Sequence, residues 1–461
     1  MTETSPDELT GGGTGSSTDY DTTLDTTGEP DSDTATALTT TPGTTDAATE
    51  TQTETDDPAT TIEPTSETTD TTEDTTTSED SSTTSGPTGG DGDLPCPPDS
   101  QTTTFEYIWI ANSSQGTVSK IDTGVGHEVA RYKTAIQKSE PSRTSVNQYG
   151  DVAVSNRIPG SVTKIAAVLE RCEDRNNNGE IETSTSPFDI LAWEKDECVL
   201  WNTPIPSIAY NTGPRPTAWE ATYQDPVTCE TPTPRLWIGY RDGDGDAHFL
   251  RLDGDSGDIL DDAVFPNWPG DFGPYGGAVN GEGDLYAIGI ADAPVVHVDA
   301  ETLEITELTS PTTAVKYGIA VDENGDLWVT GTEPGNNLFH YSVPQKKWTA
   351  LGGGGGNWVL GVAVDQEGRV WGAGSSPCRL VQASVDQLDY VDPAIMLPGC
   401  SQPWGVSVDD EGYVWVVDKA NKAFKVDPDT HQTVAVVTGL VDPYTYSDMT
   451  GQGLKLVSSS G

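Results

Sequence analysis

Residues 1–95 contain no lysine or arginine and only one aromatic residue, Tyr20. The same segment holds 23 Asp and Glu residues and 33 Thr residues. So little apolar surface cannot offset the conformational entropy that is lost on folding. We therefore predict a disordered, low-complexity acidic stalk or linker over residues 1–95. The remaining 366 residues carry all 12 Trp, 51 acidic and 23 basic residues, which is enough for a folded domain over residues 96–461.

The chain also lacks any run of 18 apolar residues, and it lacks a basic stripe. The first absence excludes a membrane-spanning helix. The second, with a formal net charge of −51, argues against nucleic acid as a partner, because the chain would repel phosphate. The first residues, MTETSPDELTGGG, lack the basic and apolar regions of a secretory signal. We expect a monomer.

None of the six cysteines belongs to a CxxC pair, which argues against a thiol zinc site or a redox motif. An even number of cysteines, all after the predicted stalk, favours disulfides instead. Short loops favour two of the pairs and elimination leaves the third: Cys172–Cys198, Cys378–Cys400 and Cys96–Cys229. Disulfides persist in oxidising compartments, and Thr-rich acidic stalks are typical of exposed proteins, so we predict an extracellular or cell-surface location. An upstream start with a signal or a lipoprotein cysteine would reconcile this location with the missing signal.

Two familiar catalytic signatures, G-x-S-x-G and H-E-x-x-H, are missing as well. The glycine-rich stretch Leu351–Trp358 lacks the Lys-Ser/Thr of a phosphate loop, and we interpret it as a flexible connector. Carboxylates are so abundant that a glycosidase-type pair is neither indicated nor excluded. We assign no catalytic residue.

The C-terminal half contains a repeat. Four segments align without gaps: YGGAVNGEGDLYAIG from Tyr275, YGIAVDENGDLWVTG from Tyr317, LGVAVDQEGRVWGAG from Leu360 and WGVSVDDEGYVWVVD from Trp404. Each reads as a strand, a D-x-x-G turn and a second strand, followed by a polar turn and a third strand. A period of about 42–44 residues with several strands per unit is typical of propeller blades rather than of a solenoid.

Weaker copies precede these four. They begin at Ser142 and Arg215, and a partial unit begins at Tyr107, which gives seven units. The two ends of a closed propeller usually share a blade, because closure leaves no open sheet edge. We therefore expect Thr445–Val457 to form the strand that pairs with Tyr107–Ala111. The sequence predicts an all-β, seven-bladed β-propeller preceded by the stalk.

The motif x-G-[VI]-x-V-D-x-x-G-x-[LV]-W resembles the repeats of the streptogramin lyase (virginiamycin B lyase-like) family and of the wider NHL and gluconolactonase-like propellers, over about residues 105–457. That resemblance implies a Pro-His-Gly at the inner end of certain blades, where histidines hold magnesium and a base opens a cyclic ester by elimination. The equivalent positions here begin at Pro274, Lys316, Val359 and Pro403, and none of them is followed by histidine. The chain's five histidines fall on outer strands or in connections: His127, His248, His297, His340 and His431. The resemblance therefore supports the fold and argues against the lyase mechanism.

The residues that begin each repeat should surround the channel mouth: Ser142, Arg215, Tyr275, Tyr317, Leu360 and Trp404. We predict ligand-binding residues among them, with Tyr275, Tyr317 and Trp404 stacking on a ligand and Arg215 holding an anion. The alternative is that these side chains plug the channel entrance. The sequence does not decide between the two.

An insertion between blades two and three, at about residues 167–213, carries a calcium-type loop, D-x-N-x-N-G-x-I. Positions 1, 3, 5 and 7 are Asp174, Asn176, Asn178 and Glu180, with glycine at position 6. Oxygen atoms at alternate positions converge on a cation when a glycine allows the sharp turn. Calcium is therefore the expected cofactor, and the alternative is an Asn/Gly turn without a metal.

Position 12 of this loop is Thr185 instead of the bidentate Glu, so the pattern is not a complete EF-hand. We expect Asp189, or Glu182 through water, to complete the shell, and a Cys172–Cys198 disulfide to clamp the loop. A second acidic loop, RDGDGDAHFLRLD, places acids at alternate positions from Asp242 to Asp246 but has no later carboxylate in register. We interpret that loop as a solvated turn.

These observations favour a non-enzymatic binding or interaction module. We expect an exported propeller, braced by calcium, that binds a small molecule, a glycan or a protein at the channel mouth. The alternative is a metal-dependent lyase or lactone hydrolase of the streptogramin lyase or gluconolactonase type, which would use carboxylates and magnesium. A structural spacer without a specific ligand is the third reading.

Overall fold

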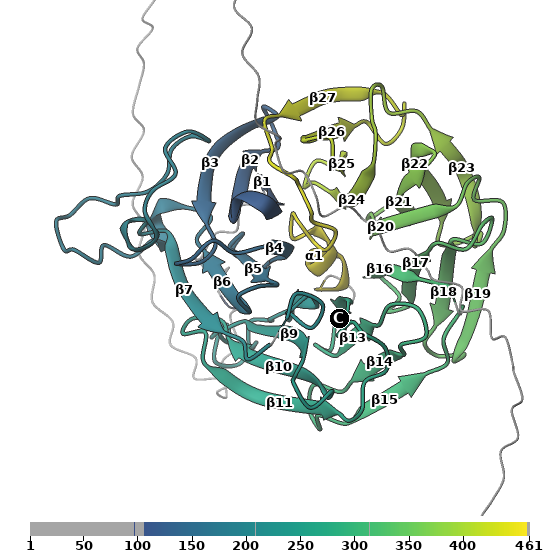
Figure 1. Cartoon of the computed structure of the whole chain (residues 1–461), viewed down its shortest axis with the longest axis horizontal. Coiled ribbons are helices and arrows are strands. Elements are labelled where there is room, and N and C mark those ends of the chain that lie inside the picture. The colour runs from purple at the N-terminus through teal and green to yellow at the C-terminus, as the bar shows by residue number, and fades with distance from the viewer. Residues whose placement is uncertain (1–95, 97–105, 208, 313, 459–461) are drawn as a thin grey trace, which may run out of the picture. The chain divides into compact units, whose positions relative to one another are not determined.

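Seven antiparallel sheets surround a central axis in the computed structural model, as Figure 1 shows. The structure describes residue 96 and residues 106–207, 209–312 and 314–458, so the predicted stalk over residues 1–95 lies outside the described residues. Six of the described sheets have four strands and one has three. The predicted all-β, seven-bladed propeller is confirmed.

The blades are numbered along the chain, and the strands within each are given from the axis outward. Blade one comprises β1 (Tyr107–Asn112), β2 (Thr117–Asp122) and β3 (His127–Lys133), and blade two comprises β4 (Pro141–Val146), β5 (Val152–Asn156), β6 (Ser161–Ile165) and β7 (Val199–Pro204). Blade three comprises β8 (Thr217–Trp219), β9 (Arg235–Arg241), β10 (Ala247–Asp253) and β11 (Ile259–Phe265). Blade four comprises β12 (Gly276–Val279), β13 (Leu285–Ile288), β14 (Val295–Val298) and β15 (Ile305–Leu308). Blade five comprises β16 (Lys316–Val321), β17 (Leu327–Gly331), β18 (Leu338–Ser342) and β19 (Lys347–Leu351). Blade six comprises β20 (Trp358–Val364), β21 (Arg369–Ser376), β22 (Cys378–Ser384) and β23 (Asp389–Ile395). Blade seven comprises β24 (Pro403–Val408), β25 (Val414–Asp418), β26 (Lys422–Val426) and β27 (Thr433–Thr438). The helices are η1 (Ser113–Gln115), η2 (Leu169–Arg171), η3 (Trp193–Lys195) and α1 (Gln452–Ser458).

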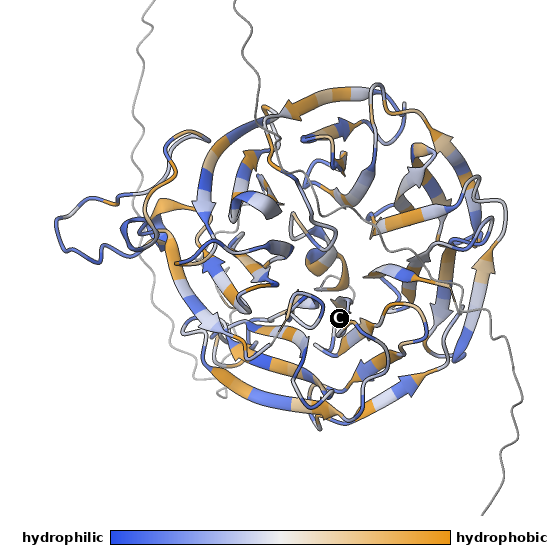
Figure 2. Ribbon diagram, viewed as in Figure 1, coloured by the Kyte–Doolittle hydropathy of each residue, from blue (hydrophilic) through white to orange (hydrophobic). Residues whose placement is uncertain are grey.

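Burial decreases from the second strand of each blade to the fourth. Every residue of β5, β13 and β25 is buried, whereas exposed residues of β27 alternate with half-buried ones and with the buried Val437. Figure 2 shows the same change, with alternating hydropathy along the outermost strands. A strand covered by neighbouring blades on both faces can be apolar throughout, but an outer strand has one face in water. The propeller core therefore lies between the blades.

The repeated D-x-x-G turn is held by a buried carboxylate. In blade five, Oδ1 of Asp322 accepts hydrogen bonds from the backbone N–H groups of Asn324 and Asp326, at 2.9 and 3.0 Å. Oδ2 accepts the indole N–H of Trp328, six residues after the aspartate, at 2.9 Å. Blades six and seven repeat this contact at 2.8 Å, between Asp365 and Trp371 and between Asp409 and Trp415. The carboxylate therefore joins the turn to the second strand.

In blades two and four the sixth residue is not tryptophan, and the turn residue is asparagine. Asn147 precedes Ala153 at this spacing, and Asn280 precedes Tyr286. The amide oxygen of Asn280 still accepts the backbone N–H groups of Glu282 and Asp284, at 3.1 and 2.9 Å. In these five blades the turn residue supplies an acceptor, and in the three blades where it is aspartate a buried indole donates to it.

The C-terminal segment completes blade one, but not as a regular strand. The backbone N–H of Trp109 donates to the carbonyl of Met449 at 3.0 Å, and the N–H of Tyr444 donates to that of Ala111 at 3.0 Å. This confirms the predicted pairing with β1 for the first part of the segment. The prediction of a strand through Val457 is wrong, because Gln452–Ser458 forms helix α1 instead.

All three predicted disulfides are present: Cys96–Cys229, Cys172–Cys198 and Cys378–Cys400. The second one closes the inserted loop. Strand β7 lies inside the predicted insertion at about residues 167–213, so the loop separates β6 from β7 within blade two and does not join blade two to blade three. Among the described residues, no helix has the length and apolar character needed to cross a membrane.

Candidate functional site

The six residues predicted around the channel mouth lie at the start of the inner strands. Ser142, Tyr317, Leu360 and Trp404 belong to β4, β16, β20 and β24, and Arg215 and Tyr275 come just before β8 and β12. The repeat spacing therefore placed them in the correct layer. Their side chains are buried, however, and Arg215 and Trp404 are each only 1% exposed.

One apolar cluster fills the mouth. We call this set the mouth cluster: Tyr275, Tyr317, Leu360, Trp404, Tyr444 and Tyr446. Four members begin inner strands, whereas Tyr444 and Tyr446 come from the C-terminal segment, which the sequence did not assign to the mouth. Their spacing of two residues is the available sequence signal, because alternate residues of an extended segment point to the same side. The mouth is thus closed by residues of blades four to seven together with the C-terminal segment.

Three tyrosine hydroxyls meet at the centre of this cluster. The hydroxyl oxygen of Tyr444 lies 2.7 Å from that of Tyr317 and 2.9 Å from that of Tyr275. The hydroxyl of Tyr275 also donates to that of Tyr317 at 3.3 Å. Burial raises the pKa of Tyr444 to about 12 and the pKa of Tyr317 well above its ordinary value. Tyr317 and Tyr444 therefore stay neutral, and the hydrogen bonds among the three hydroxyls hold the rings in place.

Arg143 lies across the same region. It occupies the position at which the later repeats have glycine, and it donates to the carbonyl oxygens of Tyr275 at 2.5 Å and Tyr446 at 3.2 Å. These partners belong to blade four and to the C-terminal segment, so the side chain of blade two reaches over the channel. Burial lowers the pKa of Arg143 to about 9. The substitution of arginine for the repeat glycine was the sequence signal for this residue.

The arginines of the mouth are held by carbonyl oxygens and rings rather than by close carboxylates. Arg215 donates to the carbonyls of Tyr210 and Asn211 at 2.9 and 3.0 Å. Arg157 donates to the hydroxyl of Tyr210, and its carboxylate neighbour, Glu140, is 3.9 Å away. At the opposite end of the blades, cations have carboxylate partners: Arg369 with Asp365 at 2.6 Å, Arg235 with Glu220 at 2.7 Å and Lys425 with Asp409 at 3.1 Å. The mouth is therefore the less acidic end of the propeller.

Helix α1 lies across the other end of the channel, at the centre of the ring in Figure 1. Between the helix and the mouth cluster, the inner strands enclose a cavity of about 70 Å³. Asp448 is the one carboxylate that lines it. Its oxygens accept the backbone N–H groups of Gly451 at 2.8 Å and Leu454 at 3.0 Å. Burial raises the pKa of Asp448, and the carboxylate is engaged in starting α1.

None of the five histidines lies on an inner strand, as the sequence predicted. His297 is 2.8 Å from Asp284, and His340 is 3.2 Å from Asp326. Four histidines pack on an aromatic ring of the same blade or its neighbour: His248 on Tyr240, His297 on Tyr286, His340 on Trp328 and His431 on Trp371. These ring contacts give the four histidines a structural role within the blades.

The channel residues do not fit the magnesium centre that the family resemblance implies. The lining of the cavity has no histidine, and its single carboxylate, Asp448, is bound to backbone N–H groups. A hard cation needs several oxygen ligands at one point. The described channel therefore offers neither the base nor the ligand set of such a site.

The predicted calcium loop is a tight turn built on Asp174. Its two carboxylate oxygens accept the backbone N–H groups of Asn178 at 3.1 Å and Gly179 at 2.8 Å. Asn177 and Gly179 both have positive φ, 58° and 86°, which brings alternate side chains to one side. The side-chain amides of Asn176 and Asn178 lie 2.7 and 2.6 Å from the carboxylate of Glu182. The structure therefore brings together Asp174, Asn176, Asn178 and Glu182, and Glu180 continues the same turn.

Asp189 lies in a separate turn of the inserted loop. Its carboxylate accepts the backbone N–H groups of Thr185 at 2.9 Å and Ser186 at 2.8 Å. These hydrogen bonds hold the pKa of Asp189 well below its ordinary value, against a desolvation effect that raises it. A role for Asp189 as a metal ligand stays a prediction, and Glu182 is the candidate that contacts the other loop residues.

Glu197 binds the backbone of the calcium-type loop, a role that the sequence analysis did not predict. This buried carboxylate accepts the backbone N–H groups of Arg175 at 2.9 Å and Glu182 at 3.1 Å. The N–H of Glu182 holds the pKa of Glu197 below its ordinary value. Its only sequence signal was its place next to Cys198, which is disulfide-bonded to the other end of the loop.

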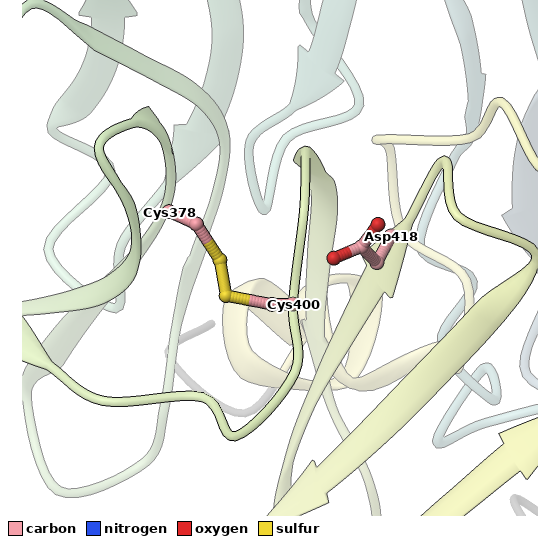
Figure 3. A group of neighbouring side chains, drawn as sticks. All are labelled: Cys378, Cys400 and Asp418. Atoms are coloured by element: carbon pink, nitrogen blue, oxygen red, sulfur yellow. A yellow bond between two sulfur atoms is a disulfide. The ribbon is translucent and has the colours of Figure 1, made fainter.

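Two further acidic groups have structural explanations. Oδ1 of Asp242 accepts the N–H groups of Asp244, Gly245 and Asp246, so the second acidic loop forms a turn around its own aspartate. Among the described residues, one group of three His, Cys, Asp or Glu side chains lies close enough together to hold a metal ion: Cys378, Cys400 and Asp418, drawn in Figure 3. Its two sulfur atoms form a disulfide, and Asp418 accepts the N–H of Ser401 at 2.7 Å. Those sulfurs are therefore not free thiolate ligands.

No protein-family model matches the sequence, and no curated protein matches it. Solved structures do. A structure of streptogramin B lyase is 13% identical, with a TM-score of 0.51, and the match covers 69% of this chain and 88% of that one. Selenomethionine-substituted virginiamycin B lyase from Staphylococcus aureus is 12% identical (TM-score 0.49, covering 68% and 91%), and a catalytically inactive variant with quinupristin is 14% identical (0.48, 72% and 97%). At 13% identity the first likeness shows a shared fold alone.

Proposed function

We propose, from a propeller fold shared with streptogramin B lyase, that this chain is a non-catalytic binding module. The observation that carries the proposal is the closure of the channel by the chain's own C-terminal segment. The mouth cluster fills one end, and α1 fills the other. A substrate has no described route to the small cavity, and the cavity offers no base of the lyase type.

Binding then takes place on the outer faces. At the mouth, Tyr210 is 39% exposed and lies over Arg157 and Arg215, with ring-to-guanidinium distances of 4.5 and 5.2 Å. Lys419 lies 4.9 Å from the ring of Trp404. This concentration of cations favours an anionic ligand or an acidic partner surface. Direct contact of a ligand with Tyr275, Tyr317 or Trp404 requires displacement of Tyr444 and Tyr446, which pack on these rings. The guanidinium of Arg215 lies instead beside the rings of Tyr210, Phe272 and Tyr275.

We also propose that calcium braces the inserted loop. Support comes from the alternate spacing of Asp174, Asn176 and Asn178 and from the positive φ angles of Asn177 and Gly179 between and after them. The oxygens of Asp174 and Asn176 accept backbone N–H groups in the structure, so calcium would have to compete with these hydrogen bonds. An exported protein would meet enough calcium to fill a modest site, and the three disulfides support export.

Turnover tests the proposal. The full chain is incubated with calcium and magnesium, a cyclic depsipeptide streptogramin and a panel of small lactones, and the products are measured by mass spectrometry. We expect no ring-opened product from protein that is shown to be folded by circular dichroism. Ring opening above the rate without protein would refute the non-catalytic assignment and support the lyase or lactonase alternative.

A further inference from the structure

The inserted loop forms a groove with the outermost strand of blade two. Figure 1 shows the loop between β6 and β7 extending outward from the ring. The groove has a volume of about 810 Å³, which is within the range of small-molecule sites. Trp193 and Leu191 line it from the loop, Trp201 and Asn202 line it from β7, and Ile136 lines it from the connection before β4.

The two indoles of the groove are held in place. Nε1 of Trp201 donates to the carbonyl of Gly254 at 3.1 Å, which fixes the ring against blade three. Trp193 lies in η3 and packs on the apolar cluster of blades one and two. Both rings are half-buried, so each keeps part of its surface open. A ligand that stacks on fixed rings loses less entropy than one that has to order them.

The charged groups deep in the groove are already occupied by the protein. Arg175 donates to the carbonyl of Val199 at 2.8 Å and to that of Asp196. Glu197 accepts backbone N–H groups at 2.9 and 3.1 Å. The exposed Glu194 and Lys195 carry opposite charges. Glu182 also lines the groove, and it accepts the side-chain amides of Asn176 and Asn178 at 2.7 and 2.6 Å. The lining therefore has three carboxylates and two cations, and it offers no basic surface that would select an anion, in contrast to the mouth.

The edge of β7 is also poorly suited to a peptide that adds a strand. Strand addition needs a row of free backbone groups along the edge. Here Arg175 occupies the carbonyl of Val199, and the strand ends at Pro204, which has no N–H to donate. A peptide would thus find the edge interrupted at both ends.

From these contacts we infer that this groove binds a neutral saccharide. Fixed indole faces stack on the apolar face of a pyranose ring, and the amide of Asn202 offers both a donor and an acceptor to its hydroxyls. Nδ2 of Asn202 donates to Thr163 at 2.8 Å, so the amide keeps one orientation. The inference rests on the proposed function, a binding module, and names a second site with a different ligand chemistry from the mouth.

Calorimetry on the full chain tests the inference. The probes are maltotetraose, cellotetraose, xylotetraose and mannotetraose, with trigalacturonic acid as an anionic comparator. We expect at least one neutral oligosaccharide to bind, and Trp193→Ala to weaken it at least ten-fold while Trp193→Phe changes the Kd by less than three-fold. Ile136→Arg places a charged side chain in the groove from a residue that is 67% exposed, so it should abolish binding without harming the fold. Phe188→Ala is the matched control, because Phe188 lies on the same loop, is 93% exposed and does not line the groove.

Failure to bind any neutral probe, or equal affinity in wild type, Trp193→Ala and Ile136→Arg, would overturn the inference. Preference for trigalacturonic acid would overturn it as well, because the site would then select charge. The same mixtures are examined by mass spectrometry. Cleavage of a bound oligosaccharide would refute the non-catalytic function and leave the saccharide groove standing, so the two failures are distinguishable.

Discussion

The buried aspartates of the repeat turns should differ in how much they depend on their tryptophans. Asp322 has the indole of Trp328 and backbone N–H groups as its donors. Asp365 also has the guanidinium of Arg369 at 2.6 Å, and Asp409 also has the ammonium group of Lys425 at 3.1 Å. Replacement of each tryptophan by phenylalanine removes the same donor and the same ring from three equivalent sites. The comparison therefore isolates the effect of charge compensation.

The expected magnitudes follow from the hydrogen bond and the lost volume. A hydrogen bond to a charged group contributes about 1.5–3 kcal/mol, and partial loss of a large buried side chain costs about 1–2 kcal/mol more. We expect Trp328→Phe to destabilise the fold by about 4 kcal/mol, because the carboxylate of Asp322 is left buried with fewer donors. Trp371→Phe and Trp415→Phe should cost about 1 kcal/mol less, because a cation stays beside each carboxylate.

The deficit of Trp328→Phe should depend on pH. Burial raises the pKa of Asp322, and the indole is the largest of the effects that lower it. A carboxyl group whose folded pKa is raised contributes stability below its unfolded pKa, about 3.9, and this contribution is lost as the pH rises through the folded value. Removal of the indole raises the folded pKa further. The deficit should therefore be smallest at acidic pH and should reach its full size near pH 7.

Urea denaturation followed by circular dichroism at pH 5 and pH 7.5 measures both effects. Asp322→Asn in the Trp328→Phe background supplies the control, since a neutral amide keeps the turn acceptor as Asn280 does. We expect this second change to recover at least part of the lost stability and to remove the pH dependence. The reasoning would be refuted if Trp328→Phe cost no more than Trp371→Phe, or if Asp322→Asn made it worse.

Three further changes test other parts of the structure. Asp174→Ala should lower the Tm more in calcium than in chelator. The control is Asp242→Ala, in a turn of the same kind that has no later carboxylate in register, and it should lower the Tm equally in calcium and in chelator. Equal losses for Asp174→Ala in the two conditions would contradict calcium binding. Replacement of both Cys172 and Cys198 by serine should lower the free energy of unfolding by about 3.5 kcal/mol, according to the loop-entropy relation for a separation of 26 residues. Urea denaturation measures this loss, and a loss under 1 kcal/mol would show that the disulfide does not hold the loop. Leu454→Ala, in α1, should cost about 2–5 kcal/mol because the side chain is buried over the channel, and an unchanged Tm would show that the helix does not dock there.

The sequence predicted the parts of this structure that depend on short-range spacing. The 42–44-residue period, the D-x-x-G turns and the even set of cysteines gave the blade count and all three disulfides. These features are local, so the chemistry that selects them is visible in a single repeat.

The parts that it did not predict depend on contacts between distant residues. Leu454–Val457 alternates like a strand, but Asp448 accepts N–H groups at the start of α1, and a helix satisfies its own backbone where no sheet edge is available. The mouth tyrosines are buried because Tyr444 reaches them from the other end of the chain. The role of Arg143 also depends on distant residues. The sequence shows that arginine replaces the glycine of the later repeats, but it does not show the partners of Arg143 in blade four and in the C-terminal segment.

Hydroxyl-radical footprinting of the full chain, read residue by residue by mass spectrometry, is the most direct test of a closed channel. The account predicts that Trp404, Tyr275 and Tyr317 are labelled far more slowly than their intrinsic reactivity allows, while Tyr210 and Phe188, which are exposed, are labelled rapidly. Rapid labelling of Trp404, Tyr275 and Tyr317 in folded protein would show an open mouth. That result would contradict the account and return these residues to the role of a ligand site.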